Sequence, residues 1–413
     1  MQKLNKINIR SKVVAFVDSH INSYKTGSSL NNSWSFGALL GFMLVLQIIS
    51  GILICFHYSA TEKEAFDSII LYTRNGTYGW FIRYLHANGA SMFFILVYLH
   101  IGKAFFYGSY FKPRQYVWAV GIVMFLIMMA TAFLGYVLPW GQMSFWGATV
   151  ITNLFTSIPE VGDELVTLMW GGFSVSGPTL QKFFGLHFAL PWILAILTCL
   201  HLALLHAASS TTPSGAEKSN LLSFHPFFTL KDLQAILALL FFLTIIITYF
   251  PNTMGHPDNY IPANPMVTPK HIVPEWYFLP FYAILRSIPD KQGGVVAMGS
   301  AIVVLFVLPF INSSVVRNTY YRPYYCWFLG FFFVDFVALG WIGQNPVEAP
   351  FDTVGLLLTV YYFFFLIVVI PVMGFFEKYL IRFGFIEVPM NEIDDLNFRE
   401  SLKNKRDLKK FKF

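Results

Sequence analysis

The sequence is poor in charge and in cysteine. Only 12% of its 413 residues are Asp, Glu, Lys or Arg, whereas soluble domains carry about 25%. Its three cysteines occur singly in apolar runs, without the CxxC spacing of zinc sites or the CxxCH spacing of covalent haem attachment. We expect Cys55, Cys199 and Cys326 to be small core residues. The scarcity of charge excludes an ordinary soluble enzyme and indicates a membrane protein.

The first residues also lack the apolar core and small-residue cleavage site of a secretory signal peptide. We expect residues 1–32 to contain a short helix on a membrane surface, with Val13, Val14, Phe16 and Val17 on its apolar side. The missing targeting segment is compatible with synthesis inside an organelle.

Hydrophobic residues make up 56% of the chain and gather in eight runs long enough to cross a bilayer. The predicted fold is therefore an all-α membrane protein with eight transmembrane helices. The expected spans are 34–58, 84–102, 116–138, 183–208, 233–249, 293–316, 323–343 and 354–373. Short surface helices are expected in the long third connection, and the lysine-rich tail 386–413 is expected to be exposed.

The distribution of Lys and Arg predicts the orientation. Eight spans place both termini on one side, which carries 21 of the 28 basic residues. Basic residues favour the negative side of a membrane. We therefore expect the termini in the mitochondrial matrix or the bacterial cytoplasm.

Two histidine pairs share one spacing. His86 and His100 are 14 positions apart in the second span, and so are His187 and His201 in the fourth. Fourteen residues are close to four helical turns and rise about 21 Å, so both members of a pair face the same way. A single membrane histidine often only bonds a neighbouring helix. The duplicated spacing instead predicts two stacked His–His sites, and neutral imidazole is a good ligand for haem iron. Span parity pairs His86 with His187 and His100 with His201.

Glycines repeat the same spacing in the neighbouring spans. Gly37 and Gly51 are 14 positions apart in the first span, and Gly121 and Gly135 in the third. Small residues also serve helix packing in membranes. Their match to the histidine spacing favours clearance for a flat macrocycle. By topology, Gly37 and Gly121 lie at the depth of His100 and His201, and Gly51 and Gly135 at that of the other pair.

The segment RYLHANGASMFF around His86 resembles the first ligand segment of the mitochondrial cytochrome b family, the membrane core of ubiquinol–cytochrome c oxidoreductase (complex III). The resemblance covers about residues 33–385. It implies a di-haem bundle over 33–210 and a four-span domain over 211–385. It implies two non-covalent b-type haems, of low potential at His86 and His187 and of high potential at His100 and His201. The four glycines would contact these haems.

The resemblance also implies a quinol-oxidising pocket on the positive side of the membrane. Residues 274–277 match the PEWY motif of the family. Glu275 lies among aromatic residues, where burial favours the protonated carboxyl, and it could accept a proton from a quinol. The alternative is a solvated loop glutamate. Tyr277, Tyr136 and Phe278 resemble other lining residues, and residues 146–153 the bordering surface helix.

A quinone-reducing pocket is implied on the negative side. His206 lies about 140° from the ligand face around the helix, and with Asp232 it could deliver two protons. Asp232 could instead compensate charge at a helix N-terminus. Lys231, Trp34 and Ser210 are further members implied by the family. The run 207–211 departs from the family's usual Glu-Thr-Gly-Ser-Asn, and Ser210 falls on the serine of that motif.

Arg83 is the expected partner of a haem propionate on the positive side. Lys103 and Lys182 stand where many relatives have Arg, and can neutralise a propionate without bidentate geometry. Asp335 is expected to face protein.

The implied function is ubiquinol oxidation coupled, through two haems and quinone reduction, to proton translocation. The chain has no Rieske or c-type haem motif, so we expect a Rieske iron–sulfur subunit, a cytochrome c1-type subunit and further subunits, in a homodimeric complex without nucleic acid. Alternatives are a haem-bearing anchor of a dehydrogenase, with one quinone pocket, or a transporter or channel, which leaves the spacing unexplained. A plastoquinol-oxidising relative would be split after the fourth span, with its second histidine pair one residue wider. The continuous chain instead favours the mitochondrial inner membrane or a bacterial plasma membrane.

Overall fold

The computed structural model describes residues 14–15, 18–19, 21–213, 220–390, 393 and 395–410, with backbone alone for 405–410. Val13, Phe16 and Val17 of the expected surface helix lie outside these residues. Val14 is helical and exposed.

Eight helical rods in the described residues are long and apolar enough to span a membrane, as predicted. The eighth rod is continuous but contains a π-helical stretch, η6, between α13 and α14. The fourth helix begins six residues earlier than expected, because Ser176 and Thr179 form a capping box around Pro178 at its first turn. The rods are α2 (Phe36–Cys55), α4 (Gly79–Phe106), α5 (Gln115–Val137), α8 (Gly177–Ala208), α9 (Phe227–Tyr249), α11 (Lys291–Ile311), α12 (Pro323–Gln344), and α13 (Phe351–Phe364) with η6 (Phe365–Val369) and α14 (Ile370–Phe383).

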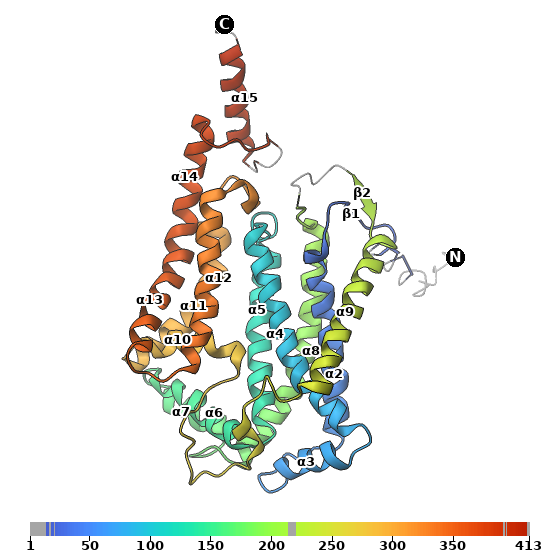
Figure 1. Ribbon diagram of the computed structural model, residues 1–413, viewed down its shortest axis with the longest axis vertical. Helices are drawn as coiled ribbons and strands as arrows, with labels where there is room; N and C mark the ends of the chain where they lie inside the picture. The colour runs from blue at the N-terminus through green and yellow to red at the C-terminus, as the bar shows by residue number, and fades with distance from the viewer. Residues whose placement is uncertain are drawn as a thin grey trace, which may run out of the picture.

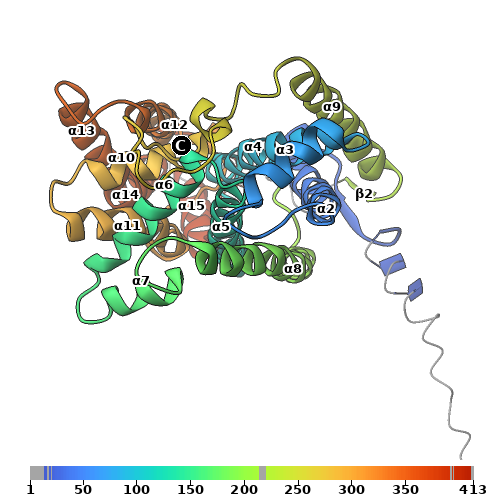
Figure 2. The ribbon, with the colours of Figure 1, turned by 90° about the horizontal axis from the view of Figure 1, so that it is seen from below.

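The rods form two groups (Figures 1 and 2). Helices α2, α4, α5 and α8 make one bundle, in which α2 packs on α4 and α5 on α8, while α9 covers α4 and α2. Helices α11 to α14 form the second group around a short buried helix, α10 (Leu279–Arg286). One hydrophobic core runs through both groups, from Phe94 and Phe125 to Leu329 and Phe365.

We call the end of the molecule with β1, β2 and α15 the upper end, and the end with α3, α6 and α7 the lower end (Figure 1). The lower end carries the short helices expected after the third span. These are α6 (Gln142–Asn153), η2 (Leu154–Ser157) and α7 (Gly162–Trp170). Three further short elements belong to other connections, namely α3 (Ala65–Asn75), η3 (Pro257–Tyr260) and η4 (Trp276–Phe278).

The upper end holds a hairpin that the sequence did not predict. Strand β1 (Lys25–Gly27) pairs antiparallel with β2 (Leu221–Ser223), so part of the segment expected to be a surface helix is a strand. The single turns η1 (Asn32–Trp34) and η5 (Thr319–Tyr321) lie between other elements of the chain.

The tail is partly docked, which corrects the expectation that it is exposed. It forms α15 (Leu396–Lys410), and Phe398 packs with Val316, Ile381 and Ile393 in a small separate cluster. Burial of this side chain holds the first turn of α15 against the protein.

The cysteine prediction is wrong for two residues. Cys199 and Cys326 are exposed on α8 and α12, on surfaces that would face lipid or other chains in a membrane, and Cys55 is half-buried. An apolar run does not say which side of a membrane helix faces outward. Asp335 is buried at 3% exposure, as expected from the cost of a carboxyl in lipid.

Candidate functional site

The structure brings the four histidines together in the predicted pairs. The rings of His86 and His187 have centroids 6.2 Å apart, and those of His100 and His201 are 6.5 Å apart. Each pair joins α4 to α8 across the inside of the bundle. The two pairs lie one above the other because each helix presents both histidines on one face.

Hydrogen bonds fix the rings of the lower pair. His187 donates from Nδ1 to the carbonyl of Thr131 at 2.8 Å. Nδ1 of His86 lies 3.0 Å from the hydroxyl of Ser50, which itself donates to the Leu46 carbonyl at 2.8 Å. The Ser50 oxygen therefore accepts from His86, and Nε2 of both rings is left to bind a metal.

The four glycines lie beside the four rings. A Cβ at Gly135 would be 2.4 Å from Cε1 of His187, and one at Gly51 would be 3.0 Å from Cε1 of His86. In the upper pair, the corresponding distances are 3.3 Å from Gly121 to His201 and 3.8 Å from Gly37 to His100. The matching of glycines to histidines is the one predicted. The clearance is much tighter in the lower pair, where a methyl group would meet the imidazole.

This arrangement fits a haem iron held between two imidazoles. Metal–nitrogen bonds of about 2 Å on each side would hold two imidazole centroids roughly 6 Å apart, close to both observed separations. The glycine surfaces leave room for a flat ring beside the ligands. Both His–His pairs are thus suitable for six-coordinate haem, with all protein ligands from α4 and α8.

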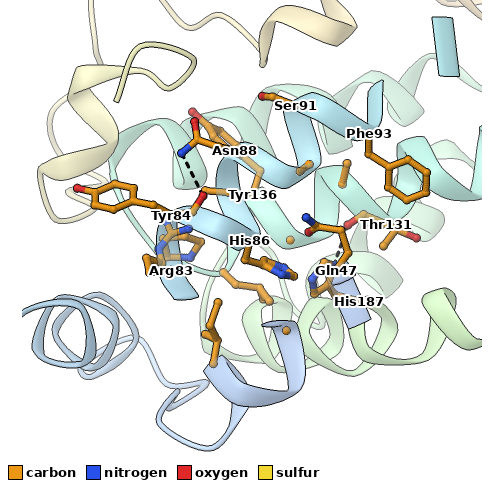
Figure 3. Close-up of a pocket in the computed structure, with 18 of the residues that line it drawn as sticks. Gln47, Arg83, Tyr84, His86, Asn88, Ser91, Phe93, Thr131, Tyr136 and His187 are labelled. Atoms are coloured by element: carbon orange, nitrogen blue, oxygen red, sulfur yellow. Dashed lines mark hydrogen bonds between the residues drawn. The ribbon is translucent and has the colours of Figure 1, made fainter. Parts of the chain in front are cut away.

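A cavity of about 300 Å³ surrounds the lower pair and extends to the PEWY segment. Figure 3 shows His86, His187, Arg83 and Tyr136 around it. Glu275 and Tyr277 line the same cavity, together with residues of the loop after α9. Apolar lining with a few converging polar groups is typical of a cofactor or ligand site.

Glu275 supplies the carboxyl group of this cavity, and it lies outside the membrane helices. Burial raises the pKa of its carboxyl to about 7, an effect partly offset by the Tyr136 hydroxyl and by Arg83. The Tyr136 hydroxyl is buried close to this carboxyl without a well-formed hydrogen bond. Near neutral pH the carboxyl can therefore take up or release a proton at little cost. The solvated-loop alternative is disfavoured by this burial.

Tyr277 and Phe278, the other predicted pocket residues after Glu275, pack against aromatic side chains. The Tyr277 ring stacks on Phe94 at 3.9 Å, and its carbonyl accepts a hydrogen bond from the Tyr98 hydroxyl. Phe278 packs edge-on against Phe94 at 5.7 Å and against the hydrophobic core, and it does not line the cavity. The aromatic contacts make the PEWY segment rigid.

The two positive side chains proposed near the lower end behave differently. Arg83 lines the cavity, within electrostatic reach of Glu275 and Tyr136. Nζ of Lys182 donates to the Leu168 carbonyl at 2.6 Å, which ties it to the surface segment α7. Arg83 is the one of these two that remains placed for a propionate.

At the upper end, Lys103 and Trp34 lie together near His100. The Lys103 ammonium lies 4.1 Å from the Trp34 ring centroid and acts electrostatically on His100. It is also within electrostatic reach of Lys231 and Arg114. This concentration of positive charge suits an anionic propionate or a quinone oxygen.

Asp232 and Lys231 connect α9 to the segment before α2. Nζ of Lys231 donates to the Asn31 carbonyl at 2.9 Å. Asp232 lies beside Ser35, and its Oδ1 is buried without a hydrogen-bond partner. Burying a carboxyl oxygen without a hydrogen-bond partner costs free energy. The position of this oxygen therefore suits contact with a ligand better than a structural role.

His206 lies apart from the ligand pair, as its position on the helix predicted. Its ring stacks on Tyr24 with centroids 4.3 Å apart, and the Tyr24 hydroxyl hydrogen-bonds Ser210. The Ser209 carbonyl accepts from Nε of Arg114 at 2.6 Å. The unusual run after His206 is therefore anchored by Arg114.

Several residues of these sites were not predicted from the sequence. They are Tyr24, Ser35, Ser50, Tyr84 and Tyr260. Ser50 directly precedes Gly51, so a polar residue beside the glycine repeat was a usable signal. Burial raises the pKa of the Tyr260 hydroxyl to about 12. No local motif marks Tyr24 or Tyr260, because each reaches its site from a distant loop.

Comparisons with known proteins show the family to which the chain is similar. Residues 21–209 match the family described as Cytochrome b/b6/petB, and residues 262–363 match Cytochrome b(C-terminal)/b6/petD. A cytochrome b of Phytophthora megasperma is 52% identical, with 91% of this chain and 98% of that protein covered. A cytochrome b of Rickettsia conorii is 50% identical, with 91% and 94% covered.

A solved structure has the same fold. A chain of a hyperthermophilic respiratory Complex III superposes with a TM-score of 0.84 at 32% identity, over 90% of this chain and 98% of that one. The family matches cover more than half of the sequence. The chain therefore belongs to the cytochrome b family.

Proposed function

We propose that this chain is the di-haem subunit of a ubiquinol–cytochrome c oxidoreductase, which oxidises quinol at the lower end and reduces quinone at the upper end. The observation that carries the proposal is the stacking of two His–His pairs with ring centroids 6.2 and 6.5 Å apart. His86 and His187 would hold the haem of lower potential, and His100 and His201 that of higher potential. Bound haems would supply one-electron transfer between the two ends.

At the lower end, Glu275 accepts a proton from quinol. Its raised pKa, about 7, lets the carboxylate form at neutral pH and still bind a proton in the reaction. Tyr136 and Arg83 surround the carboxyl and favour its ionised form. Tyr277 and the aromatic wall hold the segment in place.

At the upper end, Asp232 and His206 donate the two protons that a quinone takes up on reduction. The unpaired oxygen of Asp232 supports this role. Lys103, Lys231 and Trp34 supply positive charge and an aromatic wall beside it. Ser210 stands near His206 through their shared contact with Tyr24.

The subunit works in a complex within a membrane. The eight apolar rods and the likeness to a respiratory Complex III support a multi-subunit membrane assembly. We infer a Rieske iron–sulfur subunit and a cytochrome c1-type subunit as electron acceptors, within a homodimeric complex. The charge distribution supports termini in the matrix of a mitochondrion, or in the cytoplasm if the membrane is bacterial.

A redox titration followed by reduced-minus-oxidised spectra tests the proposal. We expect two b-type components with different midpoint potentials. In the variant His201→Leu, the higher-potential component should disappear while the lower remains. A single component in the parent complex, or loss of the lower-potential component alone in the variant, would contradict the assignment.

A further inference from the structure

The segment before α2 packs against the upper end of α8. Strand β1 pairs with β2, and the Tyr24 carbonyl accepts from the Phe224 amide at 2.8 Å. Gly27 lies so close to the loop after α8 that a Cβ there would be 2.6 Å from Cγ2 of Thr212. This contact and the hairpin fix the segment that carries Tyr24.

The loop after α8 is also held from its other side. The Ser109 and Thr211 hydroxyls hydrogen-bond at 3.0 Å, and Nδ2 of Asn318 donates to the Pro213 carbonyl at 2.7 Å. With the bond from Arg114 to Ser209, the connection between α4 and α5 and the connection between α11 and α12 both hold this short loop. These hydrogen bonds hold the backbone on both sides of Ser210, and the side chains of His206 and Ser210 each contact Tyr24.

Tyr24 makes two different contacts with these two side chains. Its ring stacks on the His206 imidazole at a centroid distance of 4.3 Å and an interplanar angle of 17°. Its hydroxyl reaches the side chain of Ser210. Burial raises the pKa of the Tyr24 hydroxyl, so it stays protonated and hydrogen-bonding at neutral pH. One side chain thus sets both the plane of the imidazole and the direction of the serine hydroxyl.

We propose that Tyr24 is a positioning residue of the quinone-reducing pocket, which orients His206 for proton donation and Ser210 for quinone binding. A proton donor works only within hydrogen-bond reach and in the correct direction, and small displacements of a reacting group cost large factors in rate. The stack restricts rotation of the His206 ring, and the hydroxyl contact restricts Ser210. The inference rests on the proposed function, because it assumes that quinone is reduced beside His206.

Two substitutions separate the two contacts. Tyr24→Phe keeps the stack and removes the hydroxyl, whereas Tyr24→Leu removes both. The assay uses the whole complex in the Glu275→Gln background, with haems reduced chemically and then reoxidised by a short-chain ubiquinone in a stopped-flow instrument. The haem spectrum of each sample measures assembly separately from rate.

We expect the two variants to differ in their effects on quinone binding and on the maximal rate of haem reoxidation. Tyr24→Phe should raise the half-saturating quinone concentration severalfold with a maximal rate near that of the parent. Tyr24→Leu should also lower the maximal rate by roughly tenfold or more. Tyr320→Leu, which changes an exposed tyrosine at the same end, should leave both values unchanged.

The outcomes distinguish this inference from the function on which it rests. If Asp232→Asn slows reoxidation but both Tyr24 variants behave as the parent, the positioning role is wrong and the pocket remains. If Tyr24→Leu only reduces haem content and leaves the rate per haem unchanged, Tyr24 is merely structural and the inference fails. If Asp232→Asn and both Tyr24 variants all leave reoxidation unchanged, quinone is not reduced at this end and both proposals fail.

Discussion

Gly135 lies against the imidazole of His187 so closely that a Cβ at this position would be 2.4 Å from Cε1 of the ring. Helix α5 therefore approaches the lower histidine pair at a point where only glycine fits without movement of the ring. Gly135 comes 14 residues, or about four helical turns, after Gly121 on α5. The two glycines therefore lie on the same face of the helix, each beside one histidine of α8.

We predict that Gly135→Ala displaces His187 and lowers occupancy of the lower-potential haem. The methyl group must push the ring aside, and overpacking in a buried site costs about 1–3 kcal/mol. Reduced-minus-oxidised spectra should show selective loss or shift of that component. Gly41→Ala is the matched control, because a Cβ at Gly41 meets nothing within 4 Å. Equal spectra for the two variants would mean that the glycine has no role at the haem.

The pH dependence of quinol oxidation should follow Glu275. Its pKa is about 7, so the proton-accepting carboxylate is roughly a tenth of the population one pH unit below that value and nine tenths one unit above. Turnover should therefore rise between about pH 6 and 8, in the direction of ionisation. Steady-state assays across this range measure the profile.

Glu275→Gln should lower turnover by about a hundredfold and flatten this profile while both haem spectra persist. The amide keeps the size of the side chain but cannot accept the proton. Glu348→Gln changes an exposed carboxyl and should retain the parent profile. A parent-like profile in Glu275→Gln would assign the pH dependence to another group.

Asp232→Asn tests the upper end. The substitution keeps the shape of the side chain and removes its proton, so reoxidation of the higher-potential haem by quinone should slow by about tenfold or more. Reduction of the lower-potential haem by quinol should be nearly unchanged. Rapid-mixing kinetics with the lower pocket blocked or open separate the two steps. Impaired quinol oxidation with normal haem reoxidation would reverse the assignment of the two ends.

A buried ion pair joins Arg322, the residue before α12, to Glu377 of α14. Nε of Arg322 donates to Glu377 at 2.7 Å, with side chains 1% and 3% exposed, and the guanidinium lies 3.8 Å from the Tyr325 ring centroid. Glu377→Gln leaves the buried guanidinium without its counter-charge and should destabilise the protein by about 3–5 kcal/mol.

Loss of haem absorbance on heating measures this effect. Lys378→Gln removes the neighbouring pair with Asp395, whose side chains are 40% and 38% exposed at 3.5 Å, and should cost no more than about 1 kcal/mol. Similar heat sensitivity in Glu377→Gln and Lys378→Gln would show that the buried pair contributes little.

The sequence by itself determined the membrane architecture. Apolar length and the scarcity of charge predict eight spans, because a bilayer imposes one minimum helix length on every crossing. The spacing of 14 residues, together with the direction in which each span crosses the membrane, also determined which histidines pair and which glycines face them, because helical period and rise are constants of the α-helix. The PEWY segment was recognisable as a short motif.

Only the tertiary structure decided what reaches each site from a distance. The contact of Tyr24 with His206, the position of Tyr260 near Glu275, and the tie of Lys182 to Leu168 join segments with no shared period or motif. The outward position of Cys199 and the docking of Phe398 likewise depend on which face a helix turns to its neighbours. Helical periodicity sets relations within one helix, whereas loop closure and packing between helices set these contacts.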